Sequence, residues 1–299
     1  MRDLLQKILN ASAPAEAVTW LGDTIIDQET AFRKRPFYYR FSGVSRHFDK
    51  RGIVEVTDEQ LLALAAQVPG FTVKGWDQFR LARVILLLVL GKQDKAIFLE
   101  TIAALLNTAD LREQAAIYSA FPLLPHQEDL VEAAVDGLRS NIIDIFDSIA
   151  LQNPFPAARF SVEAWNQMVL KAIFINRPIY KIEGIEARSN AELAAAVSYL
   201  AHERWAAGRK LSPESWRNCA AFVTDGIVSD LEHLINEGDS VDHEAAALVI
   251  VRDGTERVRH LHERIEAELD AISSGSLSWE RLGEKLEFPA TLNGSPAKS

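Results

Sequence analysis

The sequence has a single cysteine, Cys219, in 299 residues, so the chain has no second thiol with which to form an internal disulfide bond. Its 15 glycines and 11 prolines are too few for a collagen-like or low-complexity chain. The longest apolar run, VILLLVL at 84–90, has seven residues, whereas a membrane-spanning helix needs about 20. The first residues, MRDLLQKILNAS, lack the long apolar core of a signal peptide. These absences predict a soluble protein of a reducing compartment, the cytoplasm.

Motifs for phosphate binding and nucleophilic catalysis are also missing. The chain contains no G-x-G-x-x-G, no glycine loop followed by Gly-Lys-Ser/Thr and no G-x-S-x-G. The segment HLHERIE carries His260 and His262, but residues two apart on a helix point about 200° apart. Cys219 has no histidine beside it, and we expect it to be a small buried apolar residue. We therefore expect no metal, no cofactor and no catalytic activity.

The charge balance argues against a nucleic-acid partner. The chain has 42 acidic and 32 basic residues, which gives a formal net charge of -10. A nucleic-acid-binding domain usually carries a basic excess. The 48% hydrophobic and 25% charged residues are instead typical of a globular protein with a sizeable core.

Helix signals follow one another along nearly the whole chain. Thr57 with Gln60, and Ser189 with Glu192, each have the spacing of a capping box at the start of a helix. The long apolar segment that follows Gly75 predicts a helix whose second half is central. No segment shows the alternating pattern of a strand. We predict an all-α fold, in which antiparallel helical hairpins stack in a HEAT-like or irregular α-solenoid.

No linker of low complexity divides the chain, so we predict one domain over residues 1–285. The remaining segment, 286–299, contains FPATLNGSPAKS and is typical of a disordered tail. In the last part of the predicted domain, single helices are expected over 213–237, 240–252 and 255–273.

The helix that follows NPFP at 153–156 carries three polar residues in an otherwise apolar sequence. Gln167 and Lys171 are four residues apart and share one strip of this helix, whereas Asn166 lies apart from them. A buried Asn166 needs a partner, either a carbonyl of the NPFP turn or a ligand in a cavity. Lys171 either reaches water along its stem or joins Gln167 in a polar strip that faces a cavity.

A second helix, over about 190–207, places an arginine on its apolar face. The stripe formed by Leu193, Val197 and Leu200 continues at Arg204, while His202 lies at the border of the polar face. Arg204 either reaches the surface and caps the last carbonyls or forms a buried ion pair. The acidic residues considered as partners are Asp144, Asp147 and Glu183.

Residues 32–51, FRKRPFYYRFSGVSRHFDKR, interleave seven Lys or Arg with six aromatic residues. Such a mixture suits phosphate groups or an anionic membrane surface, and it makes Arg40, Arg46 and Lys50 candidate anion contacts. The alternative is a loop-rich surface segment whose aromatic side chains dock on the helices. We keep a small anionic metabolite and a peripheral membrane contact open for this segment.

Several blocks of the sequence resemble the EboA family of bacterial proteins. These blocks are LLPHQE, GLRSNIIDIFDSIALQNPFPAARFSVEAWNQMVLKAIF and AHERWAAGRKLSPESW, with FSGVSRHFDK and ARVILLL in the expected order before them. The likeness extends over about 40–280 and is densest over 121–217. The positions of this chain that match the family motif are Asn153, Pro154, Trp165, Asn166, Gln167, Lys171, His202, Glu203, Arg204 and Trp205.

The resemblance implies a role in secondary-metabolite traffic but assigns no role to any residue. The family is named for an operon that also encodes a prenyltransferase-like membrane protein and several metabolic enzymes, so these proteins are the implied partners. The first hypothesis is a non-enzymatic helical adaptor or metabolite-binding protein. The alternatives are an enzyme acting on a small anionic or polyhydroxylated metabolite, and a pure protein–protein scaffold. The candidate ligand-binding residues are Asn166, Gln167, Lys171, His202, Arg204 and Trp205.

Overall fold

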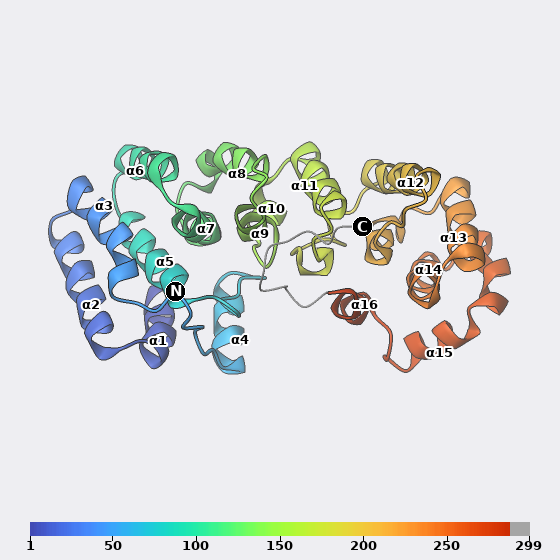
Figure 1. Cartoon of the computed structure of the whole chain (residues 1–299), viewed down its shortest axis with the longest axis horizontal. Helices are drawn as coiled ribbons and strands as arrows, with labels where there is room; N and C mark the ends of the chain where they lie inside the picture. The colour runs from blue at the N-terminus through green and yellow to red at the C-terminus, as the bar shows by residue number, and fades with distance from the viewer. Residues whose placement is uncertain (288–299) are drawn as a thin grey trace. The chain divides into compact units, whose positions relative to one another are not determined.

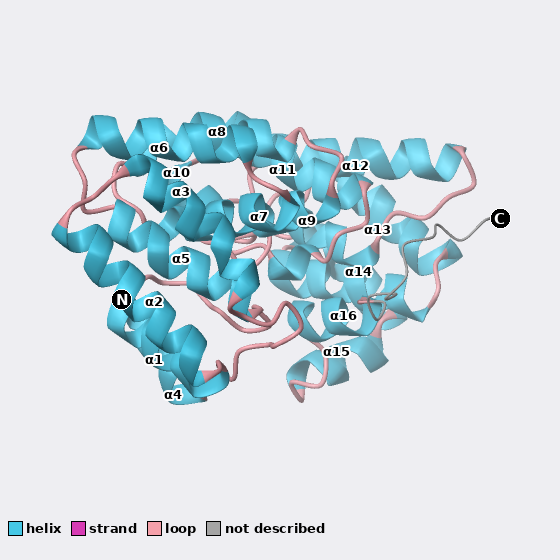
Figure 2. Cartoon of the chain, turned by 60° about the vertical axis from the view of Figure 1, so that its left-hand side comes forward, coloured by secondary structure: helices cyan, strands magenta, loops and turns pink. Residues whose placement is uncertain are grey.

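A computed structural model describes residues 1–287, and over this range the chain folds into α-helices and short 3-10 helices (Figures 1 and 2). The only β-type pairing among these residues is an isolated antiparallel bridge between Ile53 and Asp77. The predicted all-α fold is therefore confirmed. Residues 288–299 of the predicted disordered tail lie outside the described residues. None of the helices over 1–287 is long and apolar enough to cross a membrane.

The chain divides into two compact units, Met1–Ala164 and Trp165–Ser299, and the division falls in the first turn of one helix. The first unit contains α1 (Arg2–Ser12), α2 (Ala15–Thr30), α3 (Lys34–Gly43), η1 (Val44–Arg46), α4 (Asp58–Gln67), α5 (Gln78–Leu90), α6 (Lys95–Thr108), α7 (Leu111–Ala120), η2 (Phe121–Leu123), η3 (Gln127–Leu130), α8 (Val131–Leu138), α9 (Ile143–Ala150) and α10 (Phe155–Arg159). The single domain and the solenoid stacking stay predictions.

Helix α5 is the core of the first unit. The side chain of Asp77 caps it by accepting a hydrogen bond from the Arg80 amide at 2.7 Å, and Gly91 follows its last residue. Its second half is buried almost throughout, as its apolar sequence predicts, and it packs against α1, α2 and α7. The Thr57–Gln60 capping box predicted at the start of α4 is also confirmed.

One arginine lies inside this core. Arg83 of α5 is 1% exposed and faces Glu113 of α7 with 3.5 Å between Nη2 and Oε1. Its Nε donates a hydrogen bond to the Phe41 carbonyl, and its guanidinium lies over the Phe41 and Phe79 rings. Burial lowers the pKa of Arg83, although the Glu113 carboxylate opposes that effect.

The NPFP turn is held by its own asparagine. Asn153 is buried, and its amide nitrogen donates to the carbonyls of Tyr118 at 3.2 Å and Ser148 at 2.9 Å. Its side-chain oxygen accepts the Phe155 amide at 3.0 Å. The alternative in which Asn166 bonds a carbonyl of this turn is wrong, because the Asn166 amide pairs with that of Asn190 instead.

The second unit begins within α11 (Val162–Phe174), whose first three residues belong to the first unit. Its other elements are η4 (Ile179–Lys181), α12 (Ala191–Ala206), η5 (Pro213–Cys219), α13 (Asp225–Glu237), α14 (Ser240–Asp253), η6 (Glu256–Arg264), α15 (Glu266–Ser273) and α16 (Trp279–Leu286). Helix α14 packs against η5, α13, α15 and α16.

Two of the three single helices predicted here are interrupted. The helix expected over 213–237 is η5 followed by α13, because Thr224 starts a new helix by accepting the Ile227 amide. The helix expected over 255–273 is likewise split into η6 and α15. A capping residue, Thr224, therefore marks the first break, whereas Ile265 at the start of α15 makes no side-chain cap hydrogen bond.

The capping box predicted at Ser189 and Glu192 is also wrong. Asn190 is the N-cap of α12, and its side chain accepts the Leu193 amide at 3.0 Å. Ser189 turns away and donates to the Ile185 carbonyl at 2.9 Å and to the side-chain oxygen of Asn218 at 3.3 Å. Asparagine and serine are about equally good caps, so the sequence could not decide between these neighbours.

Candidate functional site

The 3-10 helix η5 is the polar centre of the second unit. Every residue from Glu214 to Cys219 is buried, although four of them are polar. Successive side chains of a 3-10 helix point about 120° apart, because the helix has three residues per turn. Trp216 and Arg217 accordingly line two different hollows, with volumes of about 220 Å³ and about 480 Å³.

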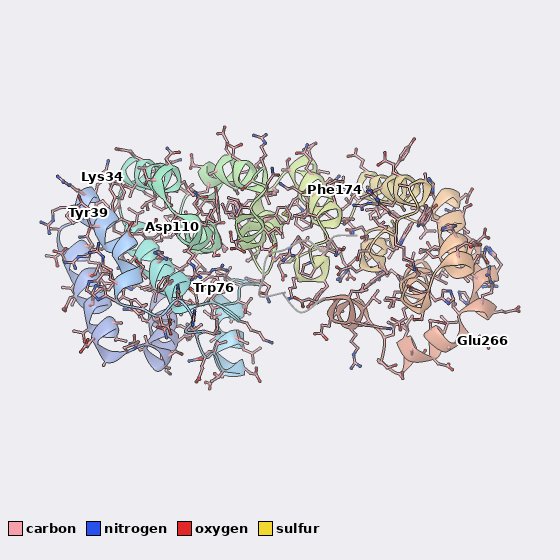
Figure 3. The ribbon with its side chains drawn as sticks, in the orientation of Figure 1. Lys34, Tyr39, Trp76, Asp110, Phe174 and Glu266 are labelled. Carbon is pink, nitrogen blue, oxygen red and sulfur yellow. The ribbon has the colours of Figure 1, made fainter. Side chains whose placement is uncertain are left out.

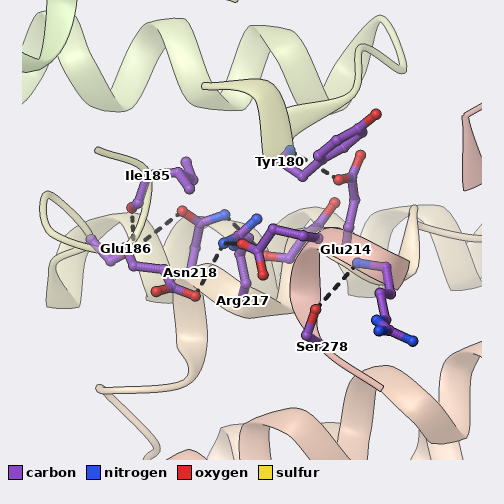
Figure 4. Close-up of polar contacts among 11 residues, drawn as sticks. Tyr180, Ile185, Glu186, Glu214, Arg217, Asn218 and Ser278 are labelled. Atoms are coloured by element: carbon purple, nitrogen blue, oxygen red, sulfur yellow. Dashed lines mark hydrogen bonds and ion pairs between the residues drawn. The ribbon is translucent and has the colours of Figure 1, made fainter. Parts of the chain in front are cut away.

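A buried carboxylate fixes η5 to the preceding segment. Glu214 accepts the backbone amides of Ile179 and Tyr180, both at 3.0 Å, and Figure 4 shows it beside Tyr180. Burial raises the pKa of Glu214, and these two hydrogen bonds oppose the rise. One turn later, the Asn218 amide donates to the Ser215 carbonyl at 3.1 Å. These contacts hold the side chains of η5 in fixed directions.

Arg217 is the charged group of the larger hollow, which we call the Arg217 cavity. Its side chain is 3% exposed, and its Nη2 donates to the carboxylates of Glu186 at 3.1 Å and Glu280 at 3.0 Å (Figure 4). Its guanidinium lies 5.8 Å from the centre of the Trp279 ring. Its Nε and Nη1 are buried and have no hydrogen-bond partner among the described residues.

The wall of the Arg217 cavity combines polar and apolar groups. Glu186 and Arg217 lie on it, and α16 contributes the indole of Trp279. Its further lining residues include Ser189, Ala220, Leu248, Val251 and Arg252. Arg252 is exposed and makes no ion pair with any described residue. A hollow whose wall joins apolar surface to a few placed polar groups is a usual form of a small-molecule site.

The smaller hollow, which we call the Trp205 pocket, is lined by aromatic rings. The Trp205 ring lies 4.1 Å from the His233 ring and 6.0 Å from the Trp216 ring, between centroids. Arg209 and Lys210 bring cations to its edge. His202 is a third ring neighbour, with 5.5 Å between centroids, so much of the aromatic surface of Trp205 is used within the fold.

The lysine of the Trp205 pocket is already neutralised. Lys210 Nζ lies 2.8 Å from Asp239 Oδ2 and 3.1 Å from Asp242 Oδ2. The hydrogen bond with Asp239 raises the pKa of Lys210, and the same bond lowers the pKa of Asp239. A ligand would have to compete with two carboxylates for this cation, which makes the Trp205 pocket the weaker candidate.

His202, a predicted site residue, forms a polar group beside Trp205. Its Nε2 lies 2.6 Å from Oδ1 of Asp230, and Ser198 donates to the other oxygen of Asp230 at 2.5 Å. Asp230 is buried, whereas His202 is exposed. The carboxylate stands between serine and histidine, so histidine does not activate the serine as it does in a Ser-His-Asp triad.

Asn166, another predicted residue, is part of an amide pair. Its amide nitrogen donates to Asn190 Oδ1 at 3.2 Å, and the Asn190 amide donates to Asn166 Oδ1 at 2.8 Å. Because Asn190 also caps α12, this pair ties α11 to the start of α12. Of its two strip neighbours, Gln167 is exposed and Lys171 is half-buried.

Arg204 caps a helix, but not its own. Its Nη2 donates to the Phe174 carbonyl at 3.2 Å, and its guanidinium lies 5.3 Å from the Phe174 ring centre. Phe174, labelled in Figure 3, is the last residue of α11. It is 64% exposed. The predicted buried ion pair of Arg204 does not form with any described residue. A helical wheel predicts the direction in which a side chain points, but it does not predict how deeply that side chain is buried. The last turn of α12, which carries Arg204, lies at the surface.

The segment 32–51 forms α3 and η1 rather than the expected loop-rich stretch. Its rings at Phe37 and Phe41 are buried in the first unit, which confirms the docking alternative for them. Lys34 pairs with Glu100, and Figure 3 shows Lys34 and Tyr39 on α3. The three candidate anion contacts, Arg40, Arg46 and Lys50, are exposed and form no ion pair among the described residues.

The pKa of a histidine in this segment, His47, is lowered by its burial and by the positive charges around it. The ring of His47 stacks on Trp20 with 4.1 Å between centroids. Burial lowers the pKa of His47, and the positive charges of Arg40 and Arg46 lower it further. Anion binding by this surface stays a prediction.

The residues that sequence reasoning missed are those of the Arg217 cavity. Glu186, Arg217 and Glu280 lie 31 and 63 positions apart along the chain, and no local spacing connects them. The only local signal is the run PESWRNC, in which Pro213 opens a helix and four of the next five residues are polar. Cys219 ends this run; it is buried as predicted, and burial raises the pKa of its thiol.

Over residues 1–287, no three His, Cys, Asp or Glu side chains gather as a group that could hold a metal ion. No curated protein and no solved structure is significantly similar to the chain. The family model described as metabolite traffic protein EboA matches residues 1–220, a range that starts earlier and ends sooner than the resemblance suggested. The match includes Arg217 and η5 but ends before α13. Since it extends over well more than half of the chain, the chain belongs to the EboA family.

Proposed function

We propose that this chain is a non-enzymatic metabolite-binding protein of a secondary-metabolite traffic system, and that it holds its ligand in the Arg217 cavity. The family match supports a role in metabolite traffic. The proposal adds the cytoplasm as its location, and it adds the membrane protein and enzymes of the same operon as its partners.

The observation that carries the proposal is the buried, incompletely bonded Arg217 in the wall of a cavity of about 480 Å³. Small-molecule sites have volumes of about 300–1,000 Å³. A buried charge is rarely the most stable way to fill a core, because apolar side chains of the same size are often as stabilising. A guanidinium that keeps unpaired donors beside such a cavity is therefore better explained by a ligand than by stability.

Binding is a better account than catalysis. The most reactive arrangement in the second unit is His202 with Asp230, and neither residue is among those that line the Arg217 cavity. The buried oxygens of Asp230 are both used within the fold, by His202 and Ser198. An enzyme acting on a small metabolite remains the second hypothesis, with His202 as its acid or base.

Native mass spectrometry tests the proposal. The purified chain is incubated with the small-molecule fraction of the cells that produce it, and the mass of the folded chain is measured. We expect a discrete added mass on the wild type and none on Arg217→Met. Arg139→Met changes a surface arginine whose one ion-pair partner among residues 1–287 is Asp136, three residues earlier. It is the matched control and should keep the added mass.

A second variant covers the case in which Arg217→Met does not fold. Ala221 lies on the wall of the Arg217 cavity and is exposed, so Ala221→Phe fills space there without removing a buried group. It should fold as the wild type does and carry no added mass. An unchanged added mass on Ala221→Phe, or no added mass on the wild type, would contradict the proposal.

A further inference from the structure

The charges around the Arg217 cavity cancel. Arg217 touches two carboxylates, those of Glu186 and Glu280, so this group of three carries one net negative charge. Arg252, on the same wall, carries one positive charge. A phosphate or carboxylate bound beside Arg217 would lie close to both glutamates, and the resulting repulsion would offset its attraction to the arginines.

The same groups alternate between hydrogen-bond donors and acceptors. On the wall of the cavity, the carboxylate of Glu186 can only accept, and the guanidinium of Arg252 can only donate. The hydroxyl of Ser189 donates its hydrogen within the fold, and its oxygen keeps lone pairs that can accept a hydrogen bond. A hydroxyl group both donates and accepts, so several hydroxyls on one ligand can satisfy neighbours of both kinds.

The rest of the wall is apolar and contains one large ring. Trp279 adds its indole, and Ala220 and Leu248 add aliphatic surface. The face of an aromatic ring carries partial negative charge. It therefore attracts the C–H groups of a saturated ring whose carbons bear oxygen, while the hydroxyls at the rim of that ring reach the charged residues.

We infer that the ligand of the Arg217 cavity is an uncharged polyhydroxylated ring compound, of the class of a sugar or a cyclitol. This inference rests on the proposed function and names its ligand class. Glu186, Ser189 and Arg217 belong to the part of the chain that the family model matches. Arg252, Trp279 and Glu280 come from beyond residue 220, so the ligand class depends on helices α14 and α16 as well.

Chemical treatment of the small-molecule fraction tests this class. Sodium periodate cleaves the carbon–carbon bond between two neighbouring hydroxyl-bearing carbons, so it destroys polyols and spares most other metabolites. The full chain is incubated with treated and untreated fractions, and the compounds it retains on ultrafiltration are measured by mass spectrometry. We expect the compound retained from the untreated fraction to fall at least tenfold after periodate.

Ionic strength separates a neutral polyol from a phosphorylated one, which periodate would also cleave. Binding of an uncharged ligand should change less than twofold between low and high salt, whereas screening weakens binding of an anion. Trp279→Leu should reduce retention of the compound at least fivefold, and Trp76→Leu in the first unit serves as the control for loss of a buried indole.

The outcomes separate the two claims. A retained compound that resists periodate, or one that is lost at high salt, would overturn the polyol inference and leave the proposed function standing. If the wild-type chain retains nothing from the untreated fraction, the proposed function itself is contradicted. Retention that is sensitive to periodate, insensitive to salt and dependent on Trp279 supports both.

Discussion

Trp216 and Arg217 are consecutive residues of one buried 3-10 helix, yet they line two different hollows of the second unit. This follows from three residues per turn, which separates neighbouring side chains by about 120°. The helix itself is held by Glu214 and Asn218, so the direction of each side chain is set before any ligand arrives. An arginine placed in this way loses little conformational entropy on binding.

The Asn166–Asn190 pair gives the first prediction. Asn166→Ala should destabilise the fold by about 1 kcal/mol, because it leaves a polar partner without its bond. Asn190→Ala should cost about 1–2 kcal/mol, since it also removes the cap of α12. Urea unfolding of both single variants and the double variant should show a coupling of at least about 0.5 kcal/mol. Gln167→Ala, at the exposed neighbour, is the control; a coupling near zero would show that the amide pair contributes nothing.

Arg204→Ala gives the second prediction, and it should have a small effect. The side chain is at the surface, and it makes one hydrogen bond and one cation–π contact with Phe174. Such contacts stabilise exposed sites by about 0.5–1 kcal/mol each. Thermal unfolding should therefore show a loss of about 1–2 kcal/mol at most. A loss above about 3 kcal/mol would mean that Arg204 is in a buried ion pair after all.

The third prediction concerns the buried pair of the first unit. Arg83→Met should destabilise by about 3–5 kcal/mol, because it leaves Glu113 buried without its charged partner. The double variant Arg83→Met with Glu113→Gln should recover much of this loss, since no unpaired charge remains. Chemical denaturation of the three proteins measures the difference. Equal stability of the single and double variants would argue against the pair.

The fourth prediction concerns pH. Burial raises the pKa of folded Glu214 above the ordinary value of 4.5. A raised carboxyl pKa stabilises the fold fully below the unfolded pKa, and this contribution is lost as pH rises through the folded pKa. The stability of the wild type relative to Glu214→Gln should therefore be greatest at about pH 4 and fall as the pH rises from there through the folded pKa. Urea unfolding of both proteins across this range measures it, and a difference that grows with pH would reverse the sign.

The fifth prediction tests how α16 is seated. A Cβ at Gly283 would lie 2.3 Å from Cδ1 and 2.7 Å from Cβ of Tyr180, too close to be relieved by a small rotation. Gly283→Ala should displace α16 and with it Trp279, which lies on the wall of the Arg217 cavity. Hydrogen exchange of the α16 amides should become faster than in the wild type. Gly226→Ala, which meets only Thr224 at 3.7 Å, is the control.

The helical fold could be predicted because its signals are local. The apolar run of α5 and the Thr57–Gln60 box each depend on residues within a few turns, and both are found as expected. The burial of a side chain is harder to predict than the helix itself, because burial depends on which other elements pack against the helix. The sequence pattern left a buried ion pair at Arg204 open as one of two alternatives, whereas the buried arginines of the described chain are Arg83 and Arg217.

The candidate site was harder still to predict. Of the predicted ligand-binding residues, Trp205 lines the smaller hollow, and Asn166 and Arg204 are used to join helices. The Arg217 cavity is built from residues that meet only in the folded chain, from Glu186 to Trp279. Its one local sign is a short helix in which four of the five residues after Pro213 are polar.

The central claim is that the Arg217 cavity holds one small metabolite. Equilibrium dialysis of the compound captured by the wild type measures it most directly, as molecules bound per chain at saturation. We predict one molecule for the wild type and none for Ala221→Phe, whose added ring occupies the cavity. Equal binding by the two proteins would place the ligand elsewhere and contradict the account.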